Sequence, residues 1–384
     1  MSTKIINKTH KSSKYDMSFD DDEKNNSDQL DQINQQNDPS IDLLENFHDE
    51  DGNFVDYSSD SSDDYSDNIK IDISDQMFNQ QNDHPKYDHS FNIPSFNINK
   101  YSKHGSNHHH HMQNHHKYHQ HHHSRHQRAK LSPGDQYRKK ISDENRKIVR
   151  KHPELIDWNG VKTIGVDHCF NIPRNINRKC SIRVFDCSTI RAAIECNSAH
   201  PSAKICLLNF ANPIKPGGGY LDGKEGQEGS ICRQTLLFPT LGMSYMYNEN
   251  KRRGSKPEAS DIMIYSPNVM VIRDDKYEMI NNFPVDIISA SAVDNRKYHI
   301  YNSEEIMENR IRKIILTAAE EKVDILILGA FGCGIFKNNS TTTARIFHKI
   351  LVEENYQKFF YLIIFPIYND ANLYHIFNSI LGNK

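Results

Sequence analysis

The stretch Lys204–Gly219, which reads KICLLNFANPIKPGGG, decides how the folded part of this chain is organised. Its first part, Lys204–Phe210, is a continuous apolar run, which is typical of a strand covered on both faces. Three consecutive glycines, 217–219, follow. Because glycine lacks a Cβ, the backbone there can adopt positive φ, approach a ligand closely and present successive N–H groups to an anion. The stretch therefore predicts a buried strand that leads into a diphosphate-binding loop.

Strand-like and helix-like segments alternate around this stretch. Strands are expected at Ser181–Asp186, Lys204–Phe210, Val285–Ala290, Asp324–Gly329 and Phe359–Ile367, and helices at Pro133–Lys151, Thr189–Cys196 and Ile311–Ala319. Ile262–Ile272 is broken by Ser266-Pro267 and predicts two short strands, or a strand and a turn. Ser340 or Thr341 is expected to cap a further helix. This alternation predicts a mixed, mainly parallel sheet sandwiched by helices, an α/β fold.

A second glycine-rich segment, Gly332-Cys333-Gly334, follows the expected strand Asp324–Gly329. In open α/β sheets, ligands bind outside the carboxyl ends of the strands. Both glycine segments follow strands, so both are expected on that edge. Neither matches the P-loop pattern, which requires GxxxxGK[ST].

A candidate acid lies shortly after the first glycines. Glu228, preceded by Gln227, is placed to protonate a glycosidic leaving group if it lies over a cleft of low polarity. Glycosidic chemistry often uses two carboxylates. Asp222 and Glu225 are also near, but both are expected to be solvated loop charges.

The N-terminal third differs from the rest of the chain in composition and in hydrophobic periodicity. Residues 1–132 are rich in Asp, Asn, Ser, Gln and His without strand or helix periodicity, and are expected to be disordered; residues 133–384 are expected to form the folded domain. The low mean hydropathy of -0.76 agrees with this division. The tract His104–His126 could bind zinc, copper or nickel, but lacks carboxylates or cysteines at ligand spacing, so we interpret it as a low-complexity expansion and assign no metal site.

Composition also restricts the compartment. The seven cysteines show no CxxC pairing, which favours reduced thiols, and the N-terminus lacks the apolar core of a signal peptide. No apolar run is long enough to span a bilayer. We expect a soluble intracellular monomer, in cytoplasm or nucleus, without a membrane partner. The net charge of -3 indicates no general attraction to nucleic acid. The sequence names no partner for the N-terminal region.

Several motifs follow one another in a fixed order. They are Asn209–Gly219 (NFANPIKPGGG), Gln227-Glu228, Cys232-Arg233, Tyr265–Pro267, Val271–Asp274, Ile287–Ala290 and Leu328–Asn338 (LGAFGCGIFKN). This set resembles the signature of the microbial-type poly(ADP-ribose) glycohydrolases over roughly Ile141 to Leu381. The resemblance implies a macrodomain fold that binds ADP-ribose at the strand ends and needs no cofactor or metal.

The resemblance also implies roles for individual residues. It places Gly217, Gly218 and Gly219 along the diphosphate and the distal ribose, with Asn212 close to that ribose. It makes Gly332, Cys333 and Gly334 the second phosphate loop and packs Phe336 against the ribose. It also matches Gln227 and Glu228 to the first two residues of a catalytic Gln-Glu-Glu triplet. Without the resemblance, Phe336 would be read as a core aromatic.

The third residue of that triplet differs, because Gly229 stands where the family has its second glutamate, usually regarded as the acid. Three hypotheses remain open. The protein could be an ADP-ribosyl glycohydrolase that uses Glu228, acting on poly- or mono-ADP-ribose. It could be a non-catalytic ADP-ribose reader. It could also be an α/β nucleotide-binding protein of another kind with convergent glycine loops.

Overall fold

The computed structural model describes residues 131–297 and 300–382. The predictions of a disordered N-terminal region and of a low-complexity His104–His126 tract concern residues that lie outside these ranges, apart from Leu131 and Ser132. Within them, no helix is long and apolar enough to cross a membrane.

A seven-stranded sheet forms the centre of the described part, in the order β1-β4-β5-β3-β6-β7-β2. Its strands are β1 (Lys162–Ile164), β2 (Ser181–Phe185), β3 (Ile205–Phe210), β4 (Met263–Arg273), β5 (Met279–Ala290), β6 (Ile325–Ile327) and β7 (Leu362–Pro366). The five strands from β5 to β2 run parallel, whereas β4 is antiparallel to both of its neighbours. The predicted mixed, mainly parallel sheet is confirmed.

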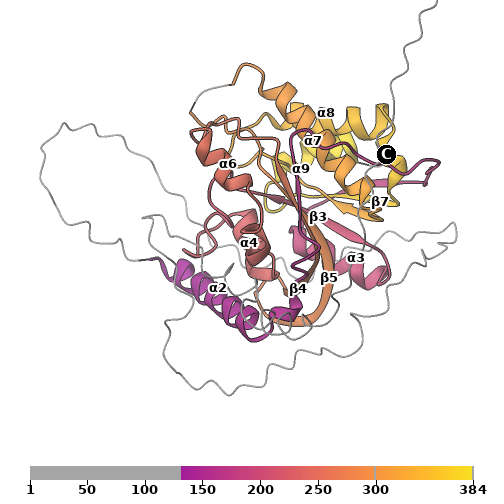
Figure 1. Cartoon of the computed structure of the whole chain (residues 1–384). Helices are drawn as coiled ribbons and strands as arrows, with labels where there is room; N and C mark the ends of the chain where they lie inside the picture. Colours follow the sequence, from indigo (N-terminus) through magenta and orange to yellow (C-terminus); the bar gives the residue numbers. More distant parts are fainter. Residues whose placement is uncertain (1–130, 298–299, 383–384) are drawn as a thin grey trace, which may run out of the picture.

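Helices cover both faces of this sheet (Figure 1). They are α2 (Pro133–Lys151), α3 (Thr189–Ala199), α4 (Gln227–Gln234), α5 (Phe238–Leu241), α6 (Met246–Arg252), α7 (Ser303–Glu320), α8 (Ser340–His348) and α9 (Ala371–Leu381), with short η helices at Pro153–Leu155, Lys349–Glu353 and Tyr356–Phe359. Apolar residues of α7, α8 and α9 pack on one face, and those of α3 to α6 pack on the other. Helix α2 lies outside α4 and contributes to a third, smaller apolar cluster.

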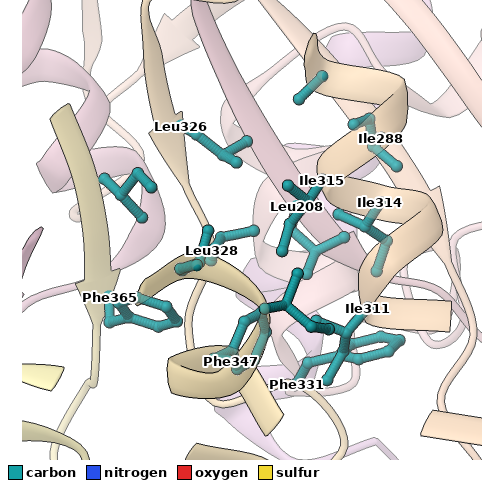
Figure 2. Close-up of a cluster of buried hydrophobic side chains, with 14 of the residues drawn as sticks. Leu208, Ile288, Ile311, Ile314, Ile315, Leu326, Leu328, Phe331, Phe347 and Phe365 are labelled. Atoms are coloured by element: carbon teal, nitrogen blue, oxygen red, sulfur yellow. The ribbon is translucent and has the colours of Figure 1, made fainter. Parts of the chain in front are cut away.

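Figure 2 shows the core beneath α7 and α8. Side chains from neighbouring strands (Leu208, Ile288, Leu326 and Phe365), together with Leu328 just after β6, meet those of the two helices (Ile311, Ile314, Ile315 and Phe347). The rings of Phe347 and Phe365 meet edge to face with centroids 5.0 Å apart. Each such side chain, once fully buried, contributes roughly 1.5–3 kcal/mol. The strands that carry the glycine loops are therefore anchored in the most apolar part of the domain.

The structure corrects two local predictions. β4 is one strand rather than two, because a bulge between Ser266 and Val269 absorbs Pro267 and the positive φ of Asn268. The N-cap of α8 is Asn339, whose side chain accepts from the N–H of Thr342, and neither Ser340 nor Thr341 is the cap. Ser340 is instead the first helical residue, since an amide side chain one position earlier already satisfies the free backbone donor.

Candidate functional site

Two loops meet at the carboxyl edge of the sheet, as expected from the sequence. The first glycine loop (residues 211–226) leaves β3, and the second glycine loop (residues 328–339) leaves β6, the parallel neighbour of β3. Their bases pack together, with the rings of Phe210 and Phe331 5.6 Å apart. Gly329, at φ 112°, leaves room for Phe210, because a Cβ there would lie 3.0 Å from its Cζ. The two loops therefore form adjoining walls of one site.

The first glycine loop turns sharply above the start of α4. Gly217 and Gly218 have φ of 70° and 53°, values that favour glycine. The Asn212 side chain shapes the approach to this turn, because its Oδ1 accepts from the N–H groups of Ile214 at 2.9 Å and Lys215 at 2.8 Å. Asn212 thus contacts the loop through its side chain and leaves its own N–H free to bind elsewhere.

That N–H donates to Glu228 Oε2 at 2.8 Å. Glu228 lies in the first turn of α4 and is only 6% exposed. A Cβ placed on Gly218 would lie 2.8 Å from the same Oε2, so the carboxyl group lies directly against the glycine turn. Its other oxygen, Oε1, is buried and has no hydrogen-bond partner among the described residues. The structure therefore brings Glu228, Gly218 and Asn212 together.

Burial raises the pKa of Glu228 to about 8, although the backbone of Asn212, the side chain of Asn209 and the backbone of Gly217 oppose the shift. The carboxyl group is consequently protonated at neutral pH and can act as an acid. Glu225 is an exposed loop charge, as expected, and pairs with Arg138, whereas Asp222 is half-buried and pairs with Lys215.

This raised pKa predicts a pH-dependent cost to folding. In the unfolded chain the carboxyl group ionises near 4.5, while in the folded protein it keeps its proton to about 8, so stability falls as pH rises between these values. Glu228→Gln removes the group that titrates. We expect the stability of this variant relative to wild type to grow from about pH 5 to about pH 8.5, by on the order of a few kcal/mol. Urea unfolding at both pH values measures the difference, and an equal difference at both would contradict the raised pKa.

Gln227 anchors α4 to the end of β3. The N–H of Phe210 donates to Gln227 Oε1 at 2.9 Å, and Gln227 Nε2 donates to the carbonyl of Leu208 at 2.8 Å. These bonds fix the helix start from which Glu228 projects. Both polar atoms of the Gln227 side chain are thus engaged with backbone groups of β3.

Position 229 faces another way. A Cβ on Gly229 would lie 3.0 Å from Arg233 Nη2 and 3.3 Å from the carbonyl oxygen of Lys224. Arg233 is fully buried and donates to the carbonyls of Lys224 and Tyr220. A side chain at position 229 therefore starts toward this guanidinium, whereas Glu228 starts toward the glycine turn.

The second glycine loop is tied to the loop that follows β5. Asn338 Nδ2 donates to the carbonyls of Val293 at 2.7 Å and Gly332 at 3.1 Å, and Asn295 Nδ2 donates to Asn338 Oδ1 at 3.1 Å. Gly332 has φ 76°, and a Cβ there would lie 2.6 Å from Asn338 Nδ2. Only glycine fits this turn without displacing the Asn338 side chain and its hydrogen bonds.

The two side chains that the motif places beside the second loop differ in character. Burial raises the pKa of Cys333 to about 11, so the thiol stays protonated and is no nucleophile at neutral pH. Phe336 is partly buried against the core, and the guanidinium of Arg296 lies 5.4 Å from its ring centroid. Both readings of Phe336, as core aromatic and as site residue, are compatible with this placement.

Sequence reasoning missed the contacts between α2 and the first glycine loop. Arg138 Nε donates to the carbonyl of Gly223 at 2.7 Å, and Lys224 pairs with Asp135 at 2.9 Å. Gly223, at φ 69°, approaches α2 so closely that a Cβ would lie 1.9 Å from the carbonyl oxygen of Asp135. These partners are far apart in sequence, and the only signal in the chain was one more glycine in a polar loop.

Comparison with known proteins gives a family match and a shared fold. Residues 139–274 match the family model described as "Microbial-type PARG, catalytic domain". The crystal structure of poly(ADP-ribose) glycohydrolase from Thermomonospora curvata superposes with a TM-score of 0.60 at 22% identity, over 64% of this chain and 100% of that one. The same enzyme bound to the inhibitor ADP-HPD gives 0.56 at 22% identity, over 64% of this chain and 99% of that one.

A direct search of curated proteins finds no match to the sequence. The resemblance to the microbial-type poly(ADP-ribose) glycohydrolases that the motifs indicated is nevertheless confirmed by the family model, and the described part has the macrodomain-like fold of these structures.

Proposed function

We propose that the protein is an ADP-ribosyl glycohydrolase whose acid is Glu228. The observation that carries this proposal is a buried, protonated carboxyl group held against the Gly217–Gly218 turn at the carboxyl edge of the sheet. The fold supports it, since the similar structures are poly(ADP-ribose) glycohydrolases.

The ligand lies between the two glycine loops in this proposal. Gly217, Gly218 and Gly219 line the diphosphate and distal ribose, with Asn212 beside that ribose. Gly332, Cys333 and Gly334 form the second phosphate loop; the Cys333 N–H donates to the Ala330 carbonyl at 3.1 Å, so Gly332 and Gly334 supply the N–H groups for the diphosphate. Phe336 packs against the ribose. Positive φ at Gly217, Gly218 and Gly332 supports this arrangement, because glycine turns of this kind let a ligand approach the backbone closely.

A cavity beside the second loop suits the adenosine. It has a volume of about 320 Å³ and lies between the starts of α7 and α8. Its walls are the polar or amphipathic side chains Asn295, Ser303, Glu304, Lys337, Asn338, Asn339, Thr342 and Thr343, and the apolar Met307 and Ile346. Hydroxyl and amide groups can hydrogen-bond a ribose and a base edge, while the two apolar side chains pack on the base.

The chemistry needs one proton donor on the glycosidic bond. As the bond from the distal ribose C1″ to the leaving oxygen breaks, its electron pair passes to that oxygen, which takes the proton of Glu228. The ribose is left as an oxocarbenium-like centre. A water molecule adds to C1″ and returns a proton to the Glu228 carboxylate. One carboxyl group therefore serves as acid and then as base.

Gly229 favours a second candidate function. If the family's second glutamate is indispensable, this chain is a reader that binds ADP-ribose without cutting it. The orientation of position 229 toward Arg233 weighs against that reading, because the acid that reaches the glycine turn is present.

One paired experiment separates the candidates. Purified protein is tested for ADP-ribose binding by calorimetry and for ADP-ribose release from poly- and mono-ADP-ribosylated protein. Binding with release supports the glycohydrolase. Binding without release on either substrate would leave the reader, and absence of binding would point to another nucleotide ligand.

Gly334 offers a test of ligand placement that leaves the fold untouched. A Cβ on Gly334 meets no atom within 4 Å, whereas one on Gly332 would displace Asn338. We expect Gly334→Ala to keep the melting temperature of wild type and to weaken ADP-ribose binding by about tenfold or more, since the methyl group occupies ligand space. Gly332→Ala, the matched variant, lowers both stability and affinity. Unchanged affinity in Gly334→Ala would remove this loop from the binding site.

A further inference from the structure

Asn209 is a polar residue inside an otherwise apolar strand. It is fully buried in β3, where its neighbours Leu207 and Leu208 belong to the two core clusters on opposite faces. Asn209 Nδ2 donates to Ser289 Oγ at 2.9 Å, and Ser289 is its register partner on β5. A buried amide costs free energy unless it is hydrogen-bonded. The pair is thus built into the sheet at its carboxyl end, next to the candidate site.

Several buried oxygen atoms of the described residues lack a hydrogen-bond partner. Among the described residues, the buried atoms without any hydrogen bond include Asn209 Oδ1, Glu228 Oε1, Ser291 Oγ and the hydroxyl of Tyr247. Most buried polar groups in native proteins are paired, so such a group of exceptions requires an explanation. Three of them belong to side chains that influence one another: the Asn209 amide opposes the rise in the pKa of Glu228, and the Glu228 carboxylate raises the pKa of Tyr247.

We propose that Asn209, oriented by Ser289, is a positioning residue that stabilises the Glu228 carboxylate left behind after proton transfer; this inference rests on the proposed function. Two elements hold the carboxyl group. Asn212 fixes Oε2 from the first glycine loop, and the Asn209 amide acts from β3. Oε1 has no hydrogen-bond partner in the described part of the chain, so the nearby Asn209 amide is what can respond when the proton leaves. Without Asn209 the acid would hold its proton too tightly to give it up readily.

Among the residues that the structure describes, no ionised group competes for this role. The titratable groups facing Glu228 are Cys232, one turn further along α4, and Tyr247 of α6. Burial raises the pKa of both well above their usual values, so both stay neutral. The proton affinity of Glu228 is therefore set by burial and by the polar groups of Asn212, Gly217 and Asn209.

The experiment compares Asn209→Leu and Ser289→Ala with Ser266→Ala. Ser266 is an equally buried serine of the same sheet, whose hydroxyl pairs with Thr240 instead. We expect kcat to fall about tenfold in Asn209→Leu and less in Ser289→Ala, and the high-pH limb of kcat to move upward by about one pH unit. Ser266→Ala should leave that limb in place. Ser289→Ala, which removes only a hydroxyl, keeps the test valid if Asn209→Leu folds poorly.

A second readout does not depend on turnover. The pKa of Glu228 in each background follows from the pH dependence of the stability difference made by adding Glu228→Gln. An upward shift in the Asn209→Leu or Ser289→Ala background supports the positioning role, even if no substrate is cleaved and the proposed function fails. An unchanged pKa in folded variants, or an equal shift in Ser266→Ala, would overturn it.

Discussion

Replacing Glu228 by glutamine is expected to lower turnover of ADP-ribosylated protein by about 10²–10⁴-fold, the usual cost of losing a general acid. Glutamine keeps the shape of the side chain and its contact with the Asn212 N–H, but it has no acidic proton. The affinity for ADP-ribose should stay within a few-fold of wild type, because the glycine loops are unchanged. Single-turnover hydrolysis and calorimetry measure the two quantities separately.

Glu225→Gln is the matched control, since Glu225 lies three residues away, has a side chain that is 80% exposed and forms a surface ion pair with Arg138. It should change turnover by less than about twofold. Gly229→Glu adds a comparison: its carboxylate would start beside Arg233, whose charge favours the ionised form and makes a poor proton donor. Turnover in that variant should stay within about tenfold of wild type. A large gain there, with an inactive wild type, would show that the site lacks its acid.

The fold could be predicted from the sequence where one pattern dominates locally. Continuous apolar runs such as Lys204–Phe210 and the helical spacing of Ile311–Ala319 correspond to β3 and α7. β1, with only three residues, offers no period to detect. α4 reads QEGSICRQ, in which polar residues and a glycine hide the helix. It forms because both of its ends are held: Gln227 is hydrogen-bonded to β3 at the start, and Asn145 of α2 donates to the carbonyl of Arg233 at the end.

The sequence indicates candidate residues for the site, but it does not indicate their protonation state. The glycines and Glu228 stand out in the sequence, and their motif order indicates the family. The proton on Glu228 depends on burial beneath Gly218 and on Asn209, and neither can be read from spacing. Asn209 itself looked like one more residue of a buried strand. Its role arises from contacts with β5 and α4, which exist only in the folded protein.

Deleting residues 1–152 is expected to abolish ADP-ribose binding and turnover, whereas deleting residues 1–130 should preserve both within about twofold. The longer deletion removes α2, whose Ile148 and Val149 pack against Leu236 and Ile272. Each of these buried side chains contributes roughly 1.5–3 kcal/mol, which is a large share of a typical domain stability of 5–15 kcal/mol.

α2 also holds the peptide that leads to the acid. Asn145 fixes the end of α4, while Arg138 and Asp135 fix residues 223–225 just before its start. Arg138→Ala should therefore reduce turnover while leaving the free energy of unfolding close to that of wild type, because it frees this peptide and leaves the core intact. Lys140→Ala, on the same helix with a side chain 73% exposed, is the control and should change neither. Full activity after loss of residues 1–152 would show that Glu228 keeps its place without α2.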